Sequence, residues 1–231
     1  MKHLLLIYVL LLSANFAVAQ TIVTHVFDVD QGGSTAPTQT PTITGSGPAV
    51  SSTDLTFVGF GDYNAGLGIT NSNPKADGSN YLFVKGASVG TSMPATNTDY
   101  VGFTVSSSNG GTFNVTGASV QARTTGGAPA EVFFALRSSA DNYATDLFTG
   151  STQSTDFVTF AETNIASVTE QTSTEFRFYV WDNKANSTSP LRFDNLSVTL
   201  EAIPEPSNFA LIYGILSAHI LIRRRSPMAH N

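Results

Sequence analysis

The chain has 231 residues, a length that suits one β-sandwich or two small domains. Charged residues make up only 12% of it, against about 25% in an ordinary globular protein. The apolar share of 41% can still build a core, which excludes a wholly disordered chain. The absence of cysteine excludes disulfide frameworks, thiolate metal sites and cysteine nucleophiles. A net charge of −6 argues against nucleic acid, which needs a basic surface.

Residues 1–19 have the build of a secretory signal peptide. Lys2 and His3 precede the apolar run Leu4–Leu12, and Ala17-Val18-Ala19 is a small-x-small cleavage site. The apolar run is too short to span a bilayer well. We therefore expect export and cleavage before Gln20, with a retained membrane anchor as the alternative.

Between the ends, residues 20–201 show the pattern of an all-β ectodomain. Short apolar alternations are separated by Gly, Ser, Asn, Asp and Pro, and no window of eleven or more residues has a helical period. Such strands favour an antiparallel β-sandwich or jelly roll. Residues 32–50 and 64–80 have the composition of loops. The nine expected strands are Ile22–Val29, Leu55–Phe60, Tyr81–Val84, Tyr100–Val105, Gly111–Arg123, Ala130–Arg137, Phe157–Phe160, Ser173–Trp181 and Leu191–Leu200.

The C-terminal end carries three elements in order. Ile203-Pro204-Glu205-Pro206-Ser207 should be extended and exposed, because its prolines cannot donate backbone hydrogen bonds. The apolar run Phe209–Ile222 would form a short transmembrane helix of about 21 Å, less than the roughly 30 Å hydrocarbon core. Arg223-Arg224-Arg225 would hold its end in the cytoplasm, before the tail Ser226–Asn231.

This order of elements resembles the PEP-CTERM sorting domain of Gram-negative bacteria, over residues 203–225. The resemblance implies that Pro204, Glu205, Pro206 and Arg223–Arg225 are a sorting signal read by an exosortase, a membrane transpeptidase-like enzyme. It also implies export by the Sec machinery, a transient inner-membrane anchor at Phe209–Ile222, and a final place on the cell surface or in the extracellular matrix. A plain tail anchor with a chance Pro-Glu-Pro is the alternative.

Four segments resemble the jelly-roll ectodomain that is common in PEP-CTERM proteins. They are DYVGFTV at 99–105, FFALRSSADNY at 133–143, EFRFYVWDN at 175–183 and LRFDNLSVTLEAIPEPS at 191–207. A jelly-roll fold hosts lectins, capsid proteins and enzymes, so this resemblance supports the fold and no particular activity.

The ectodomain offers little for catalysis. Lys2 and Arg223–Arg225 account for four of the 11 basic residues and Glu205 for one of the 17 acidic ones, so the body carries a net charge of about −9. Its one histidine, His25, would have to serve any Ser-His-Asp triad, yet no Gly-x-Ser-x-Gly elbow accompanies it. We interpret His25 as an edge-strand residue, and a three-histidine zinc site is excluded.

Two carboxylates suffice for glycoside hydrolysis, so the acidic residues leave a secreted polysaccharide hydrolase open. The Glu-x-Asp-x-Glu strand of jelly-roll glucanases is absent. We expect a non-catalytic surface or matrix protein associated with exopolysaccharide or biofilm. The first alternative is a carbohydrate-binding module, and the second is the hydrolase.

The strand Glu175–Trp181 alternates strictly between two faces. If Phe176, Phe178 and Val180 face the core, then Arg177, Tyr179 and Trp181 line the opposite face. Aromatic rings there could stack on a sugar while Arg177 bonds its hydroxyls. The alternative is that Trp181 packs under a neighbouring loop.

The last strand changes its apolar parity between Phe193 and Leu196. This change requires an extra residue, so we expect a bulge at Asp194-Asn195. First and last strands often lie together in jelly rolls, so Asp28, Asp30 and Asp194 could converge on Ca²⁺. Carbohydrate-binding modules that this chain resembles hold a structural Ca²⁺ in about that place. The alternative is that these residues only make turns.

Overall fold

The computed structural model describes residues 19–27, 40–59, 67–70, 81–85, 91–95, 98–124, 131–183 and 190–203. The expected signal peptide, Pro-Glu-Pro segment, apolar helix and arginine cluster lie outside these residues. The strands are β1 (Gln20–His25), β2 (Thr42–Gly45), β3 (Val50–Ser52), β4 (Thr56–Val58), β5 (Leu67–Thr70), β6 (Tyr81–Lys85), β7 (Tyr100–Ser107), β8 (Phe113–Arg123), β9 (Val132–Ser138), β10 (Phe148–Thr152), β11 (Val158–Glu162), β12 (Ser173–Asp182) and β13 (Pro190–Ala202), with a short 3-10 helix η2 (Ser139–Asp141).

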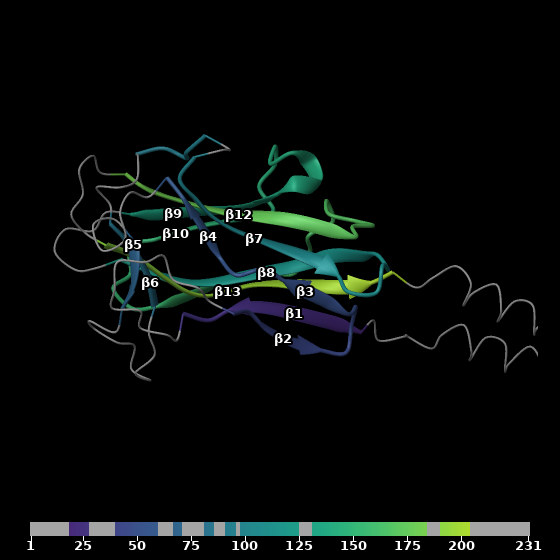
Figure 1. The fold of residues 1–231 in the computed structure, drawn as a ribbon. Helices are drawn as coiled ribbons and strands as arrows, with labels where there is room; N and C mark the ends of the chain where they lie inside the picture. Colours follow the sequence, from purple (N-terminus) through teal and green to yellow (C-terminus); the bar gives the residue numbers. More distant parts are fainter. Residues whose placement is uncertain are drawn as a thin grey trace, which may run out of the picture.

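The strands form two sheets that pack face to face (Figure 1). A seven-stranded sheet has the order β11-β8-β13-β1-β2, with β6 beside the first part of β13 and β5 beside β6. A six-stranded sheet has the order β10-β9-β12-β7-β3, with β4 also on β7. All of these pairings are antiparallel, which confirms the antiparallel β-sandwich. From β7 to β13 the chain alternates between the sheets except at the β9–β10 hairpin.

The core lies between the sheets and is rich in phenylalanine. On each of β7, β9 and β12, every second apolar residue points into the core and is at most 1% exposed: Val101, Phe103, Val105, Val132, Phe134, Leu136, Phe176, Phe178 and Val180. Phe193 of the opposite sheet meets Phe134 and Phe178 edge-on, with centroids 6.2 and 5.2 Å apart. Edge-to-face ring contacts stabilise the protein beyond the burial of apolar area, so this cluster helps to hold the two sheets in their packing arrangement.

The predicted bulge is present in β13. The register with β8 shifts between Asp194 and Ser197, and Asn195 has a φ of 51°. The extra residue lets Leu191 and Phe193 face the core before the bulge, and Leu196, Val198 and Leu200 face it afterwards, all at most 2% exposed. The parity change in the sequence therefore has the predicted structural cause.

Some expectations about the strands are wrong. β2 and β5 lie inside the ranges 32–50 and 64–80, which have loop composition, and β3 and β10 match no expected strand. These strands are short and rich in Ser, Thr and Gly, and they form because a neighbouring strand offers hydrogen-bond partners.

The interpretation of His25 as an edge-strand residue is also wrong. β1 lies between β13 and β2, and the His25 ring is fully buried. Its centroid is 4.5 Å from that of Phe103, and its Nε2 lies 3.5 Å from the hydroxyl of Ser52 on the other sheet. His25 therefore helps to join the two sheets from within the core.

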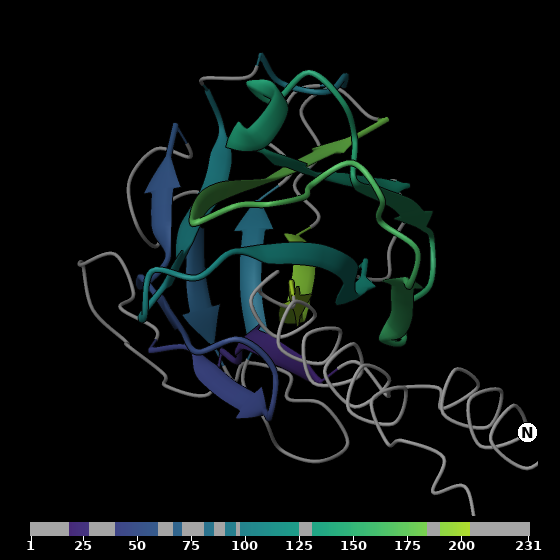
Figure 2. The same ribbon diagram turned by 90° about the vertical axis from the view of Figure 1, so that its right-hand side faces the viewer.

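Both described ends of the chain lie at one end of the sandwich, which faces the viewer in Figure 2. Gln20 is the register partner of Glu201, and Ala202 is the partner of Phe113. β12 starts at this same end, since Gln171 just before it pairs with Phe113, the partner of Ala202. It runs from there to Trp181 at the opposite end. No helix among the described residues is long and apolar enough to cross a membrane.

Candidate functional site

The outer face of the six-stranded sheet carries a row of aromatic and arginine side chains. Because Phe176, Phe178 and Val180 are buried in the core, Arg177, Tyr179 and Trp181 lie on the opposite face of β12, as the alternation predicts. Arg177 and Trp181 are partly exposed there, whereas Tyr179 is fully buried. The strand register extends this surface across the neighbouring strands. Trp181 is opposite Phe133, Tyr179 is opposite Tyr100 and Ala135, and Arg177 is opposite Arg137 and Gly102.

Phe133 and Trp181, called here the aromatic pair, are partly exposed neighbours on β9 and β12. Their ring centroids lie 5.8 Å apart and their planes are 10° from parallel. They lie at the end of the sandwich away from Gln20 and Ala202. Two nearly parallel rings with free surface are suited to contact an apolar ligand face.

Arg177 lies between two tyrosine rings. Its guanidinium carbon is 4.3 Å from the Tyr100 centroid and 3.8 Å from that of Tyr143, and its Nε donates to Oε1 of Glu175 at 2.8 Å. The side chain is 16% exposed. Because rings cover both faces of the guanidinium, a ligand can reach only its outer edge. Hydrogen bonding of Arg177 to a sugar stays a prediction.

Tyr143 reaches this cluster from the turn after η2. The Asp141 carboxylate accepts the backbone N–H groups of Ala144 and Thr145 at 3.2 and 2.9 Å, and it also bonds the Thr145 hydroxyl. Nη1 of Arg137 donates to the Tyr143 carbonyl at 3.1 Å. This bonding holds Tyr143 in a left-handed conformation with φ of 60°.

The pKa values of the tyrosine and arginine side chains in this cluster are shifted by their burial and by the Glu175 carboxylate. Burial raises the pKa of Tyr143, and a hydrogen bond to the Glu175 carboxylate raises it further. Burial also raises the pKa of Tyr179. For Arg177, burial alone would lower the pKa, but the Glu175 carboxylate together with Tyr143 and Tyr100 offsets this, and the net change is upward. The tyrosines therefore stay neutral and Arg177 stays charged.

Gly102 keeps the space beside Arg177 open. A Cβ at this position would lie 2.9 Å from Oγ1 of Thr56 and 3.0 Å from Cε2 of Tyr100. Since Gly102 is the register partner of Arg177, the missing side chain leaves room for the Tyr100 ring against the guanidinium.

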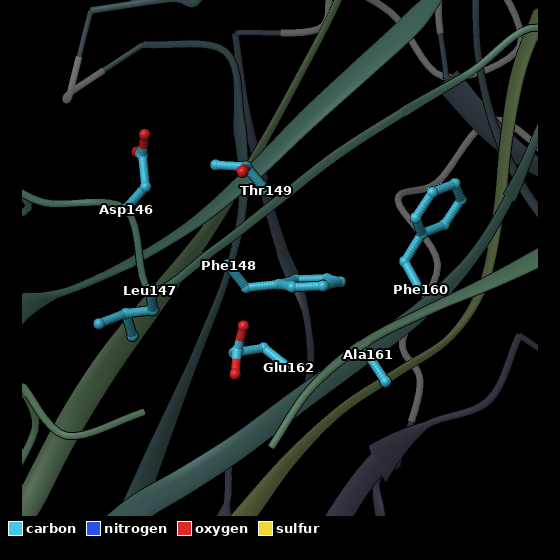
Figure 3. Close-up of a pocket in the computed structure, with 7 residues that line it drawn as sticks. All are labelled: Asp146, Leu147, Phe148, Thr149, Phe160, Ala161 and Glu162. Carbon is cyan, nitrogen blue, oxygen red and sulfur yellow. The ribbon is translucent and has the colours of Figure 1, made fainter. Parts of the chain in front are cut away.

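A separate cleft of about 330 Å³ lies where the edge strands β10 and β11 of the two sheets come together (Figure 3). The rings of Phe148 and Phe160 both pack on Phe134, with centroids 5.5 and 5.1 Å from it. Asp146 and Glu162 bring carboxylates to the cleft, and Asp146 is paired with Arg137. The full lining is Asp146, Leu147, Phe148, Thr149, Phe160, Ala161 and Glu162. None of these residues stands out as a site in the sequence.

The predicted calcium ligands are only partly described. Asp28 and Asp30 lie outside the described residues. Asp194 is 1% exposed, and its Oδ1 accepts the N–H of Asn195 at 2.7 Å within the bulge. Among the described residues no group of three or more His, Asp or Glu could hold a metal. A calcium site built from all three aspartates stays a prediction.

No protein-family model matches this chain, and no curated protein matches it. Comparison with solved structures finds partial matches of low similarity. The arabinose-bound MgGH51 α-L-arabinofuranosidase has a TM-score of 0.40 at 15% identity, covering 81% of this chain and 27% of that one. The CBM22-1 xylan-binding domain from Paenibacillus barcinonensis Xyn10C has a TM-score of 0.40 at 15% identity, and the match covers 78% of this chain and 94% of that domain. CBM29_1, a family 29 carbohydrate-binding module from Piromyces equi, has a TM-score of 0.33 at 12% identity, and the match covers 66% of this chain and 86% of that module. This chain therefore spans about a quarter of the arabinofuranosidase, and the likeness assigns no ligand.

Several residues of the outer face are absent from the site predicted from the sequence, namely Phe133, Arg137 and Tyr143. Phe133 and Arg137 alternate with the core residues of β9, a signal that places them on the outer face. The alternation gives no information on which strand lies next to β12, so the pairing of Phe133 with Trp181 could not be predicted from the sequence. Tyr143 sits in a turn, where no periodic signal exists.

Proposed function

We propose that this protein is an exported, non-catalytic β-sandwich that binds polysaccharide through the outer face of its six-stranded sheet. The aromatic pair is the observation that carries the proposal, because the C–H faces of sugar rings stack on aromatic side chains. Tyr100 and the outer edge of Arg177 lie farther along the same face and are partly exposed, so they supply polar groups that would orient the hydroxyls.

The charge of the body narrows the class of polysaccharide. The ectodomain carries about nine more acidic than basic residues, and both arginines of the outer face are paired with carboxylates. An anionic polysaccharide would be repelled by this body. A neutral polysaccharide is therefore the proposed ligand.

The proposal is tested by binding of the purified ectodomain to a panel of insoluble neutral polysaccharides. Trp181→Ala should weaken binding about tenfold, since it removes one stacking surface. Phe157→Ala is the matched control, because Phe157 is also a partly buried aromatic residue but lies outside this face, under Arg123. Equal affinity of Trp181→Ala and the parent would overturn the proposal.

The C-terminal segment supports a second proposal, that the protein is sorted by an exosortase to the cell surface or matrix. The motif Pro204-Glu205-Pro206, the apolar run Phe209–Ile222 and the cluster Arg223–Arg225 carry it. The fold is compatible with such an anchor, because β13 ends at the opposite end from the aromatic pair, which would leave that pair facing away from the membrane.

Two variants test the sorting step separately. Replacing Arg223–Arg225 with Ser removes charges that resist translocation, so the protein should reach the medium unsorted. Glu205→Ala leaves the anchor intact and should accumulate at the inner membrane with its tail. Cell fractionation with intact mass distinguishes these outcomes. If both variants reach the destination of the parent at the same mass, the sorting proposal is wrong.

A further inference from the structure

Gln20 stands at the start of β1, directly after the expected cleavage site at Ala19. Its side-chain Nε2 donates to Oε1 of Glu201 at 2.8 Å, and the residue is exposed. Its carbonyl accepts the N–H groups of Ser46 and Gly47 at 3.1 and 3.0 Å, on the β2 side. The N–H and carbonyl of one residue in an antiparallel strand point the same way, so the Gln20 nitrogen also points away from β13.

We propose that Gln20 becomes the first residue of the exported protein and closes to a pyroglutamate. This inference rests on the proposed export and on cleavage between Ala19 and Gln20. The freed α-amine attacks Cδ of its own side-chain amide, and a bond from N to Cδ forms. The bond from Cδ to Nε2 breaks, and Nε2 leaves as ammonia with a proton from the amine. The step needs no oxidant, reductant or co-reactant, and it yields a neutral five-membered lactam.

The backbone of Gly47 packs closely on the peptide between Ala19 and Gln20. A Cβ at Gly47 would lie 2.5 Å from the Gln20 carbonyl carbon and 2.7 Å from the Ala19 oxygen. Cleavage removes Ala19 and its carbonyl oxygen, and so relieves part of this crowding at the nitrogen of Gln20. The product loses the charge of the α-amine and offers no free amine to an aminopeptidase.

Glu201 sets the rate of closure in the folded protein. Its hydrogen bond holds the Gln20 amide across the strand pair, away from the amine, and closure must break it. A hydrogen bond of this kind contributes about 0.5–1.5 kcal/mol, so its removal should speed closure about twofold to tenfold. Glu201→Gln is the matched control, because its amide oxygen still accepts a hydrogen bond from Gln20.

The first experiment is mass spectrometry of the N-terminal peptide of the mature protein from its native host. The expected peptide begins at residue 20 and is about 17 Da lighter than the Gln form, the mass of ammonia. A peptide that begins at Gln20 with an intact amine overturns the inference while leaving export in place. A peptide that begins elsewhere overturns the inference and the expected cleavage site together. Gln20→Ala should abolish the mass shift.

The second experiment measures the rate of closure in pulse-labelled, exported protein. Glu201→Ala should close faster than the parent, and Glu201→Gln should close at the parental rate. Thermal melts of both variants verify that they are folded. Equal rates for Glu201→Ala and the parent would contradict the role assigned to Glu201.

Discussion

The indole of Trp181 and the phenyl ring of Phe133 lie nearly parallel, 10° apart in plane and 5.8 Å apart between centroids. They are distant in sequence and meet because the antiparallel register of β9 and β12 makes them direct partners. Cross-strand partners on one face are the closest side-chain neighbours in a sheet. The candidate site is thus a product of strand order as well as of strand composition.

The bulge in β13 should be indispensable. Deletion of Asn195 would move either Leu191 and Phe193 or Leu196 and Val198 to the solvent face, so we expect no cooperative folding. Asn195→Gly is the control, because glycine adopts the φ of 51° without strain, and its stability should match or exceed that of the parent. Circular dichroism and thermal melts measure both, and a deletion variant that melts like the parent would refute this view of the bulge.

Gly150 should tolerate no side chain. A Cβ there would lie 2.4 Å from Cζ of the buried Phe134 ring and 3.0 Å from Cδ1 of Phe160. Gly150→Ala should therefore lower the free energy of unfolding by about 1–3 kcal/mol through overpacking. Thr149→Ala, on the exposed neighbour, should change it by less than about 0.5 kcal/mol. Urea unfolding tests this pair, and equal stabilities would show that the core can yield at Gly150.

Much of the fold could be predicted from the sequence, because the apolar parity of β7, β9, β12 and β13 is strong. The bulge at Asp194-Asn195 is predictable for the same reason, since a change of parity has one simple geometric cause. Strands such as β2 and β5 were not predictable. Their few residues carry little parity, and pairing with β1 and β6 decides their structure.

The faces of single strands were predictable at the site, but the contacts between strands were not. Arg177, Tyr179 and Trp181 follow from the parity of β12, whereas the sandwich of Arg177 between Tyr100 and Tyr143 depends on strand order and on a turn. The Arg177 side chain, which the sequence predicts to bond sugar hydroxyls, is largely covered by these rings. Local sequence patterns report faces of a strand, and contacts between strands require the topology.

Stability should fall at alkaline pH. The pKa values of Tyr143 and Tyr179 are raised in the folded protein, by burial and, for Tyr143, by the Glu175 carboxylate. A raised folded-state pKa contributes stability that is complete below the unfolded pKa of about 10 and is lost as the pH rises above it. Urea unfolding at a series of pH values from about 8 to 11 should show the free energy of unfolding falling with pH. The fall per pH unit should be smaller in Tyr143→Phe. An identical slope in parent and variant would contradict the assignment.

Calcium should stabilise the protein if Asp28 and Asp30 join Asp194. A cation that binds only the folded state raises the melting temperature by mass action. We expect a higher melting temperature in Ca²⁺ than in chelator for the parent, and no difference for Asp194→Asn. A parent whose melting temperature ignores both Ca²⁺ and chelator would remove the site from consideration.

Trp181 is the only tryptophan in the sequence, so intrinsic fluorescence reports directly on the aromatic pair. Titration with a soluble neutral polysaccharide should shift its emission to shorter wavelength and saturate, because a stacked sugar excludes water from the indole. Trp181→Phe should retain part of the binding, measured by depletion, without an emission signal. A polysaccharide that binds the parent while its emission stays unchanged, or a panel in which none binds, would contradict the proposed function.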